Sequence, residues 1–215
     1  MTVSHHPSDE LMLDYAAGTM SPALELAIVT HLTFCPHCRS ASRLLESVGG
    51  QLLVEAEETA NSAWAFDKVM RRISAEWVET PAIAKPGRVV FPRALRDALG
   101  SDLEGVRWKR LGMGAYHYVI PVNDPAATAR LLKIPAGRPV PAHTHKGTEL
   151  TVVLCGAFSD ATGSYGRGDL QEADDTLLHQ PHAAPAEDCV CLAVTQEPLR
   201  FESWAARLVQ PFLGI

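Results

Sequence analysis

Two groups of potential metal ligands with different chemistry lie in one chain of 215 residues. The first group combines histidine with cysteine: His5, His6, His31, Cys35 and Cys38. The second group offers only imidazole and carboxylate: His143, His145, Glu149 and His179. Thiolates suit a closed structural zinc site, whereas a nitrogen and oxygen set suits the mouth of a small β-barrel. We therefore predict two modules, one that holds something and one that senses or reacts.

Composition supports a globular protein with real apolar cores. Hydrophobic residues make up 47% of the chain and charged residues 20%, which is ordinary for folded domains. The longest apolar run covers residues 150–158 and is interrupted by Gly156, so it is far short of the roughly 20 residues that cross a bilayer. The first ten residues show neither the basic nor the apolar part of a secretion signal. We expect a cytoplasmic protein.

Charge and cysteine usage narrow the possible partners. The five cysteines are an odd number, and in a reducing compartment a Cys-x2-Cys pair is more often metal-bound or redox-active than a structural disulfide. A net charge of −6 does not indicate the basic surface that nucleic-acid binding requires. We expect no direct nucleic-acid binding and favour a protein partner with basic surfaces, such as one that itself binds DNA or RNA polymerase.

Capping residues, prolines and apolar spacing predict that the first third of the chain is helical. The expected helices cover residues 8–18, 21–35, 36–48 and 61–77, and Gly49-Gly50 weakens the end of the third. Residues 79–86 contain two prolines and no periodicity, so they are expected to form a linker. The predicted domains are therefore 1–78, helical, and 87–215, all-β.

Short β-rich runs follow the linker, and turn residues recur about every ten positions, as in an all-β sandwich or barrel. These runs cover residues 89–91, 116–122, 131–134, 149–154 and 189–195.

The N-terminal ligand group predicts a tetrahedral zinc site. His31 lies in the last turn of its helix, and Cys35 follows four residues later on the same side. Pro36 forces a turn that brings Cys38 beside Cys35, and zinc then needs a fourth ligand, for which we prefer His6 over His5. Such a closed site would stabilise a small helical bundle rather than do chemistry. The alternative is a reduced cysteine pair beside a core histidine.

This pattern resembles the zinc-containing anti-sigma domain family, whose members bind extracytoplasmic-function sigma factors and keep them from RNA polymerase. The resemblance implies that residues 1–78 wrap against a sigma factor. The fourth helix is a candidate contact through its apolar side chains: Trp64, Phe66, Met70, Ile73 and Trp77. Such a stripe can equally be bundle core.

The C-terminal ligand group lies in a longer signature. From Gly137 to Gly156 the chain reads Gly-x5-His-x-His-x3-Glu-x6-Gly, which resembles the first signature of the cupin jelly-roll barrel at every position. Residues two apart on a strand share a face, so His143 and His145 can chelate one ion; the alternative is a pair of exposed strand histidines.

The second cupin signature is weaker, because Asp174-Asp175-Thr176 replaces its usual Pro and Gly. His179 is the expected fourth ligand, with His182 in reserve. Zinc or another divalent transition metal fits the set of three histidines and one glutamate.

Cys189 and Cys191 add a possible redox element. Two residues apart on a strand, they face one side at about 7 Å, too far for an easy mutual disulfide. Facing inward near the metal they could be low-pKa thiolates open to oxidation. Simply packed, they would be inert small apolar side chains.

The whole chain resembles the ChrR-type anti-sigma factors, in which a zinc anti-sigma domain precedes a cupin domain. The resemblance implies a non-enzymatic repressor that binds one sigma factor and releases it under oxidative stress of the singlet-oxygen type, sensed through the cupin domain. Two other functions remain open. One is a metal-dependent cupin oxygenase or isomerase with an appended zinc module, and the other is a cupin regulator that binds a small molecule.

Overall fold

The computed structural model describes residues 2–56, 63–75, 90–112, 114–198 and 200–201. Its helices are α1 (Asp9–Ala17), α2 (Pro22–Phe34), α3 (Pro36–Glu55), α4 (Ala63–Ser74), α5 (Arg93–Leu99) and a short 3-10 turn, η1 (Leu103–Gly105). Helix α1 begins where the Ser8 side chain accepts a hydrogen bond from the Leu11 amide, and it ends at Gly18, whose φ of 67° is left-handed. Proline opens both α2 and α3.

Two helices differ from the prediction. Helix α3 continues through Gly49-Gly50 to Glu55, because about 1 kcal/mol of lost propensity per glycine does not break a helix whose next turn carries a Gln51–Glu55 side-chain hydrogen bond. Helix α5 was not predicted, and residues 89–91 were expected as a strand; the described Val90 and Phe91 are not in one. The predicted linker and domain boundaries fall among residues outside the described ranges and stay predictions.

The described residues from Lys109 to Phe201 form strands and their connections, as predicted, and the fold class of a helical region followed by a β region is confirmed. The strands are β1 (Lys109–Gly112), β2 (Ala115–Val119), β3 (Thr128–Ile134), β4 (His143–Thr144), β5 (Glu149–Cys155), β6 (Ala157–Asp160), β7 (Gly163–Gly166), β8 (Leu170–Ala173), β9 (His182–Ala183), β10 (Cys189–Thr195) and β11 (Arg200–Phe201). All paired strands are antiparallel.

A six-stranded sheet in the order β1-β2-β3-β10-β5-β8 forms the main wall, and smaller sheets β7-β6-β9 and β11-β4 complete the β region. The two central strands, β5 and β10, are buried along almost their whole length. Alternate residues belong to different cores: Val152 and Leu192 join the core shared with the helices, whereas Val153 and Cys191 join a second core. The sheet is therefore covered on both faces, which explains its nearly continuous apolar sequence.

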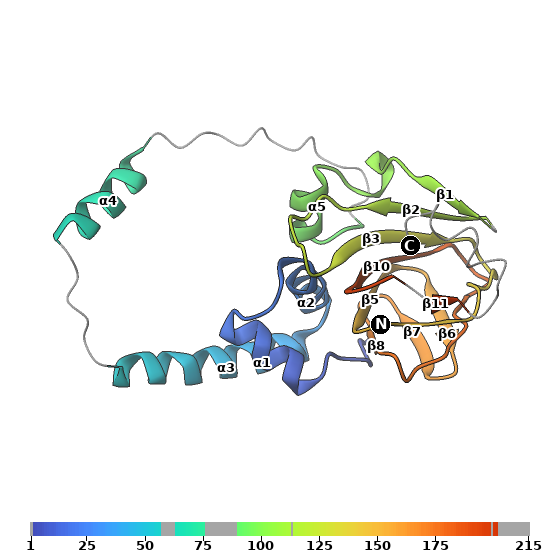
Figure 1. The fold of residues 1–215 in the computed structure, drawn as a ribbon, viewed down its shortest axis with the longest axis horizontal. Helices are drawn as coiled ribbons and strands as arrows, with labels where there is room; N and C mark the ends of the chain where they lie inside the picture. The colour runs from blue at the N-terminus through green and yellow to red at the C-terminus, as the bar shows by residue number, and fades with distance from the viewer. Residues whose placement is uncertain (1, 57–62, 76–89, 113, 199, 202–215) are drawn as a thin grey trace.

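Helix α2 occupies the outer face of this sheet (Figure 1) and contacts α1, α3 and α5 as well. Ala23, Ala27 and Ile28 are fully buried, and one core cluster joins them to Leu150 and Leu192 of the sheet. The predicted small helical bundle therefore shares its core with the β region. No helix in the described part of the chain is long and apolar enough to span a bilayer.

Candidate metal centres

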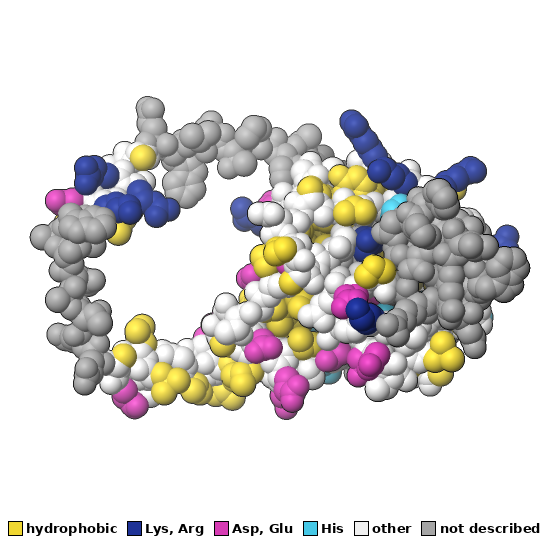
Figure 2. Space-filling model, in the orientation of Figure 1, with side chains coloured by type: hydrophobic (Ala, Val, Ile, Leu, Met, Phe, Trp, Pro, Cys, Tyr) yellow, Lys and Arg dark blue, Asp and Glu magenta, His cyan; other side chains and the backbone are white. Residues whose placement is uncertain are grey.

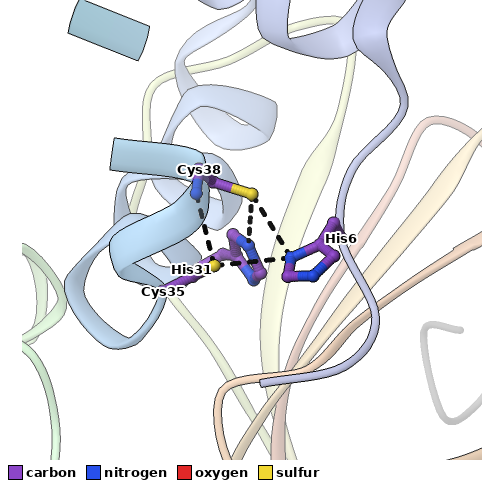
Figure 3. A group of neighbouring side chains, drawn as sticks. All are labelled: His6, His31, Cys35 and Cys38. Atoms are coloured by element: carbon purple, nitrogen blue, oxygen red, sulfur yellow. Dashed lines mark hydrogen bonds between the residues drawn. The ribbon is translucent and has the colours of Figure 1, made fainter. Parts of the chain in front are cut away.

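Four side chains meet at the junction of α2 and α3 (Figure 3) and are called here the N-terminal cluster: His6, His31, Cys35 and Cys38. Helix α2 ends at Phe34, with Cys35 as its C-cap, because Pro36 opens the next helix, and the turn carries Cys38 back beside Cys35. His6 reaches the cluster from the extended segment before α1.

The spacing of the four donor atoms fits zinc. His31 Nε2 lies 3.3 Å from Cys38 Sγ, and His6 Nδ1 lies 3.4 Å from both thiol sulfurs. A zinc tetrahedron with bonds of about 2.3 Å to sulfur and about 2.0 Å to nitrogen has edges of about 3.5 Å between the two. Together with the two thiols, this agreement points to zinc rather than to a hard oxygen-seeking ion.

The protonation states of His31 and Cys38 also favour a bound zinc ion. Burial lowers the pKa of His31 to about 4, so its imidazole is neutral near pH 7. Its Nδ1 lies 2.8 Å from the Gly168 carbonyl oxygen, which can only accept, so Nδ1 carries the hydrogen and Nε2 keeps a lone pair for a metal. Burial, reinforced by Cys35, raises the pKa of Cys38 to about 12. A cation between the sulfurs is what makes a thiolate stable in this place.

Two neighbouring histidines lie outside the cluster. His5 Nδ1 is 3.5 Å from Asp169 Oδ2, and the His5 ring lies 4.3 Å from the Tyr165 ring, so His5 contacts the barrel. The ring of His37, which follows Pro36, lies 5.0 Å from the His6 ring, and His37 contributes no donor atom to the cluster.

Three buried histidines converge inside the β region and are called here the barrel cluster: His143, His145 and His179. His143 belongs to β4, His145 follows it, and His179 lies opposite His143 in an isolated antiparallel bridge. His179 Nε2 lies 3.0 Å from His145 Nε2 and 3.1 Å from His143 Nε2. The alternative of exposed strand histidines is wrong, since all three are at most 4% exposed.

The hydrogen-bond partners of this cluster turn the Nε2 atoms toward one another. His143 Nδ1 donates to the Pro141 carbonyl at 2.8 Å, and His179 Nδ1 donates to Asp160 at 2.6 Å. Burial lowers the pKa of His143 to about 4, so its Nε2 keeps a lone pair near pH 7. The Nε2 atoms of His143 and His179 lie 3.1 Å apart, close enough for one cation to bind both.

Glu149 lies next to the cluster, at the start of β5. Its Oε2 is 3.3 Å from His145 Nδ1 and its Oε1 accepts a hydrogen bond from Thr151. Burial acts to raise the pKa of Glu149, but His145 and Thr151 outweigh it and the net shift is downward. Glu149 is therefore an anion beside the three histidines, on the far side of the His145 ring. His182, the reserve ligand, is exposed and bonds the Gln180 carbonyl instead.

Sequence reasoning missed two residues behind His179. Asp160, at the end of β6, accepts from His179 Nδ1, and Gln171 of β8 donates its amide to Asp160 at 2.8 Å. The Asp160 side chain is 0% exposed and Gln171 is 4% exposed. Neither residue belongs to the motif, and only the pairing of distant strands brings them there.

Cys189 and Cys191 differ from the expectation. Both side chains lie in the second core, and their sulfurs are 3.5 Å apart, much closer than the 7 Å of the strand repeat, at a point where the β10–β5 register shifts. The hydrogen bond with Cys189 and burial raise the pKa of Cys191 well above its ordinary value. Of the two alternatives, this favours the packed apolar side chain over the low-pKa thiolate for Cys191.

A helical cysteine–histidine cluster joined to an antiparallel β region with a buried histidine triad defines a two-centre, zinc-finger-plus-cupin class of protein. The family model described as "ChrR Cupin-like domain" matches residues 97–199, and the one described as "Putative zinc-finger" matches residues 8–39.

Over its full length and that of the relative, the chain is 45% identical to anti-sigma-E factor ChrR of Cereibacter sphaeroides. It also matches the crystal structure of Rhodobacter sphaeroides SigE in complex with the anti-sigma ChrR, with a TM-score of 0.76 and 42% identity, over 90% of this chain and 99% of that one. The chain therefore belongs to the ChrR family of anti-sigma factors. This family is regulatory rather than enzymatic, so the cupin-enzyme alternative loses its support.

Proposed function

We propose that this protein binds an extracytoplasmic-function sigma factor, one to one, in the cytoplasm and keeps it from RNA polymerase. The full-length similarity to an anti-sigma factor, and to one solved in complex with SigE, supports the proposal. The net charge of −6 suits a partner that carries basic surfaces for DNA. The helical region, 1–78, is proposed as the binding domain, 79–86 as a linker and 87–215 as the sensor domain.

The observation that carries the proposal is an uncovered apolar face on the second half of α3. Leu44, Val48 and Leu52 recur every four residues, and each is more than half exposed. Figure 2 shows apolar side chains in a row along this helix, which extends away from the β region. A row of large apolar side chains is unfavourable in water and is typical of a protein-binding surface.

Helix α4 carries a second such face. Phe66, Val69, Met70 and Ile73 are all exposed and follow the spacing of one helical stripe. The alternative reading of this stripe as bundle core therefore does not hold for these side chains, while Trp77 lies outside the described residues. We propose that α3 and α4 both contact the sigma factor.

The two centres are proposed to have different tasks. Zinc held by His6, His31, Cys35 and Cys38 would fix the α2–α3 junction that aims the α3 face. Zinc or another divalent transition metal held by His143, His145 and His179, with the predicted ligand Glu149 bonded behind the His145 ring, would make the barrel responsive to oxidants of the singlet-oxygen type. When bound, such a metal supplies a site at which oxidation of a ligand changes the local structure.

Substitutions on α3 test the binding proposal. Val48→Asp and Leu52→Asp in the full chain should each weaken binding to the cognate sigma factor by about 30-fold, the effect of losing about 2 kcal/mol at the centre of an interface. Val119→Asp, on an exposed apolar residue of β2, is the matched control. Isothermal titration and run-off transcription measure the effect, and undiminished binding by both α3 variants rejects this surface.

A further inference from the structure

The two metal centres are connected by one short stretch of chain, residues 168–171, between β7 and the middle of β8. At one end the Gly168 carbonyl accepts the hydrogen bond of His31 in the N-terminal cluster. At the other end Gln171 donates to Asp160, which accepts the hydrogen bond of His179 in the barrel cluster. Three residues of extended chain span only about 10 Å.

The N-terminal side of this connection is closely packed. Gly168 has a φ of +92°, and a Cβ there would lie 2.7 Å from Phe34 Cβ and 2.9 Å from Val3 Cγ2. Asp169 Oδ1 accepts from the backbone amides of Ser4 at 2.7 Å and His5 at 3.0 Å. The Leu170 amide donates to the His5 carbonyl oxygen, one residue before His6. Residues 168–170 therefore hold both histidines of the N-terminal cluster in place.

The barrel side is fully hydrogen-bonded. Gln171 Nε2 donates to Asp160 Oδ2 at 2.8 Å and also lies 2.9 Å from Thr162 Oγ1. The Thr162 hydroxyl in turn donates to the other Asp160 oxygen at 2.6 Å. The Asp160 side chain is 0% exposed, so a lost partner of its carboxylate is not replaced by water without rearrangement. A shift of the His179 ring must therefore move Asp160, Gln171 or both.

We propose that residues 168–171, with Asp160, couple the two metal centres, so that filling the barrel site strengthens metal binding by the N-terminal cluster. The proposal rests on the metal ligands assigned under the proposed function. Partners behind metal-bound histidines fix the ring orientation, and their loss typically weakens metal binding about 10- to 100-fold. Here two such partners are joined by a rigid, bonded segment, and the coupling must be reciprocal.

Cobalt titration of the full chain measures this coupling. Thiolate-bound Co²⁺ gives sulfur-to-metal charge-transfer absorption, which reports the N-terminal cluster because the barrel ligand set contains no thiolate. The affinity is measured against a competing chelator, with and without His143→Ala, which removes a barrel ligand that lies off the connection. His143→Ala should weaken cobalt binding by the N-terminal cluster about fivefold or more.

The same comparison is then made in a Gln171→Leu background, where His143→Ala should change the affinity less than about twofold. Asp160→Asn, a nearly isosteric change, should remove the coupling in the same way and guards against misfolding of the leucine variant. Asp124→Asn is the matched control, because Asp124 joins the barrel to the other end of α2 through the Ala23 amide. It should keep the full coupling.

Three results overturn the proposal: no effect of His143→Ala in the wild type, an equal effect in the Gln171→Leu background, or loss of coupling in Asp124→Asn. Metal analysis separates these from failure of the proposed function. One metal per wild-type chain, with the N-terminal cluster filled, rejects the barrel metal and the coupling together. Two metals without coupling reject only the connection.

Discussion

The N-terminal cluster and the barrel cluster are both buried around histidine, but the chain supports them differently. Apart from His6, the N-terminal ligands lie within one helix-to-helix turn, and the cluster itself joins α2, α3 and the N-terminal segment. Two barrel histidines, His143 and His145, lie on one segment and His179 on a distant one, and paired strands and a core that includes Val153, Phe158 and Tyr165 hold the two segments. Loss of metal should therefore disorganise the first region and leave the second folded.

The largest expected effect follows from breaking the N-terminal cluster. Cys38→Ser should remove one metal and weaken sigma-factor binding more than about 100-fold, because structural zinc sites supply roughly 10 kcal/mol of folding free energy. Metal analysis and isothermal titration measure the two quantities. Cys155→Ser, a half-buried cysteine outside both clusters, should change neither. A Cys38→Ser chain that keeps both metals and its affinity contradicts the assignment.

A smaller effect is expected from Gly168, whose carbonyl oxygen accepts the hydrogen bond of His31. Gly168→Ala should lower the metal affinity of the N-terminal cluster about tenfold, since the new Cβ would clash with Phe34 and displace the Gly168 carbonyl. Gly112→Ala is the matched control, because its φ of +93° imposes the same backbone strain with no atom within 4 Å. Chelator competition measures both, and equal effects would attribute the loss to strain alone.

Asp124 links the β region to the start of α2, because its carboxylate accepts a hydrogen bond from the Ala23 amide. Its substitution therefore tests how strongly the two regions are held together. Burial acts to raise the pKa of Asp124, but hydrogen bonds from the amides of Ala23 and Ala126 outweigh it and lower the pKa. A carboxylate at a helix N-terminus contributes about 1 kcal/mol. Asp124→Asn should thus lower the free energy of unfolding by about that amount at pH 7.

The pH dependence of this difference has a definite sign. A depressed pKa gives stability that is complete above the unfolded pKa of about 3.9 and is lost as the pH falls through the folded value. Urea unfolding of wild type and Asp124→Asn between pH 7 and pH 3 should therefore show curves that converge toward acid. A constant difference would mean that the charge plays no part.

The smallest effect on affinity is expected from the barrel cluster. His145→Ala should remove the second metal yet change sigma-factor affinity less than about threefold, because the proposed contact faces lie on α3 and α4 and the apolar cores keep the barrel folded. His182→Ala, an exposed histidine outside the cluster, should leave the metal content unchanged. Loss of sigma binding by His145→Ala would make the barrel part of the binding surface.

Local rules predicted those parts of the molecule that depend on neighbouring residues. Ser8, Pro22 and Pro36 set the helix starts, and two short motifs supplied most residues of both clusters, whereas His6 and His179 were chosen on weaker signals. The sequence did not reveal the packing of α2 against the sheet, because an apolar helix fits a bundle and a sheet equally well. Asp160 and Gln171 carry no motif, and the approach of Cys189 to Cys191 depends on an irregular strand register.

The central claim is that the helical region, organised by the N-terminal cluster, binds the sigma factor and that the barrel cluster controls its release. A sigma-dependent reporter in cells, with and without photosensitised singlet oxygen, tests this claim when Cys38→Ser and His145→Ala are compared with the wild type. The account predicts constant high expression for Cys38→Ser and constant low expression for His145→Ala, whereas the wild type responds. A normal response by His145→Ala, at wild-type protein levels, would contradict it.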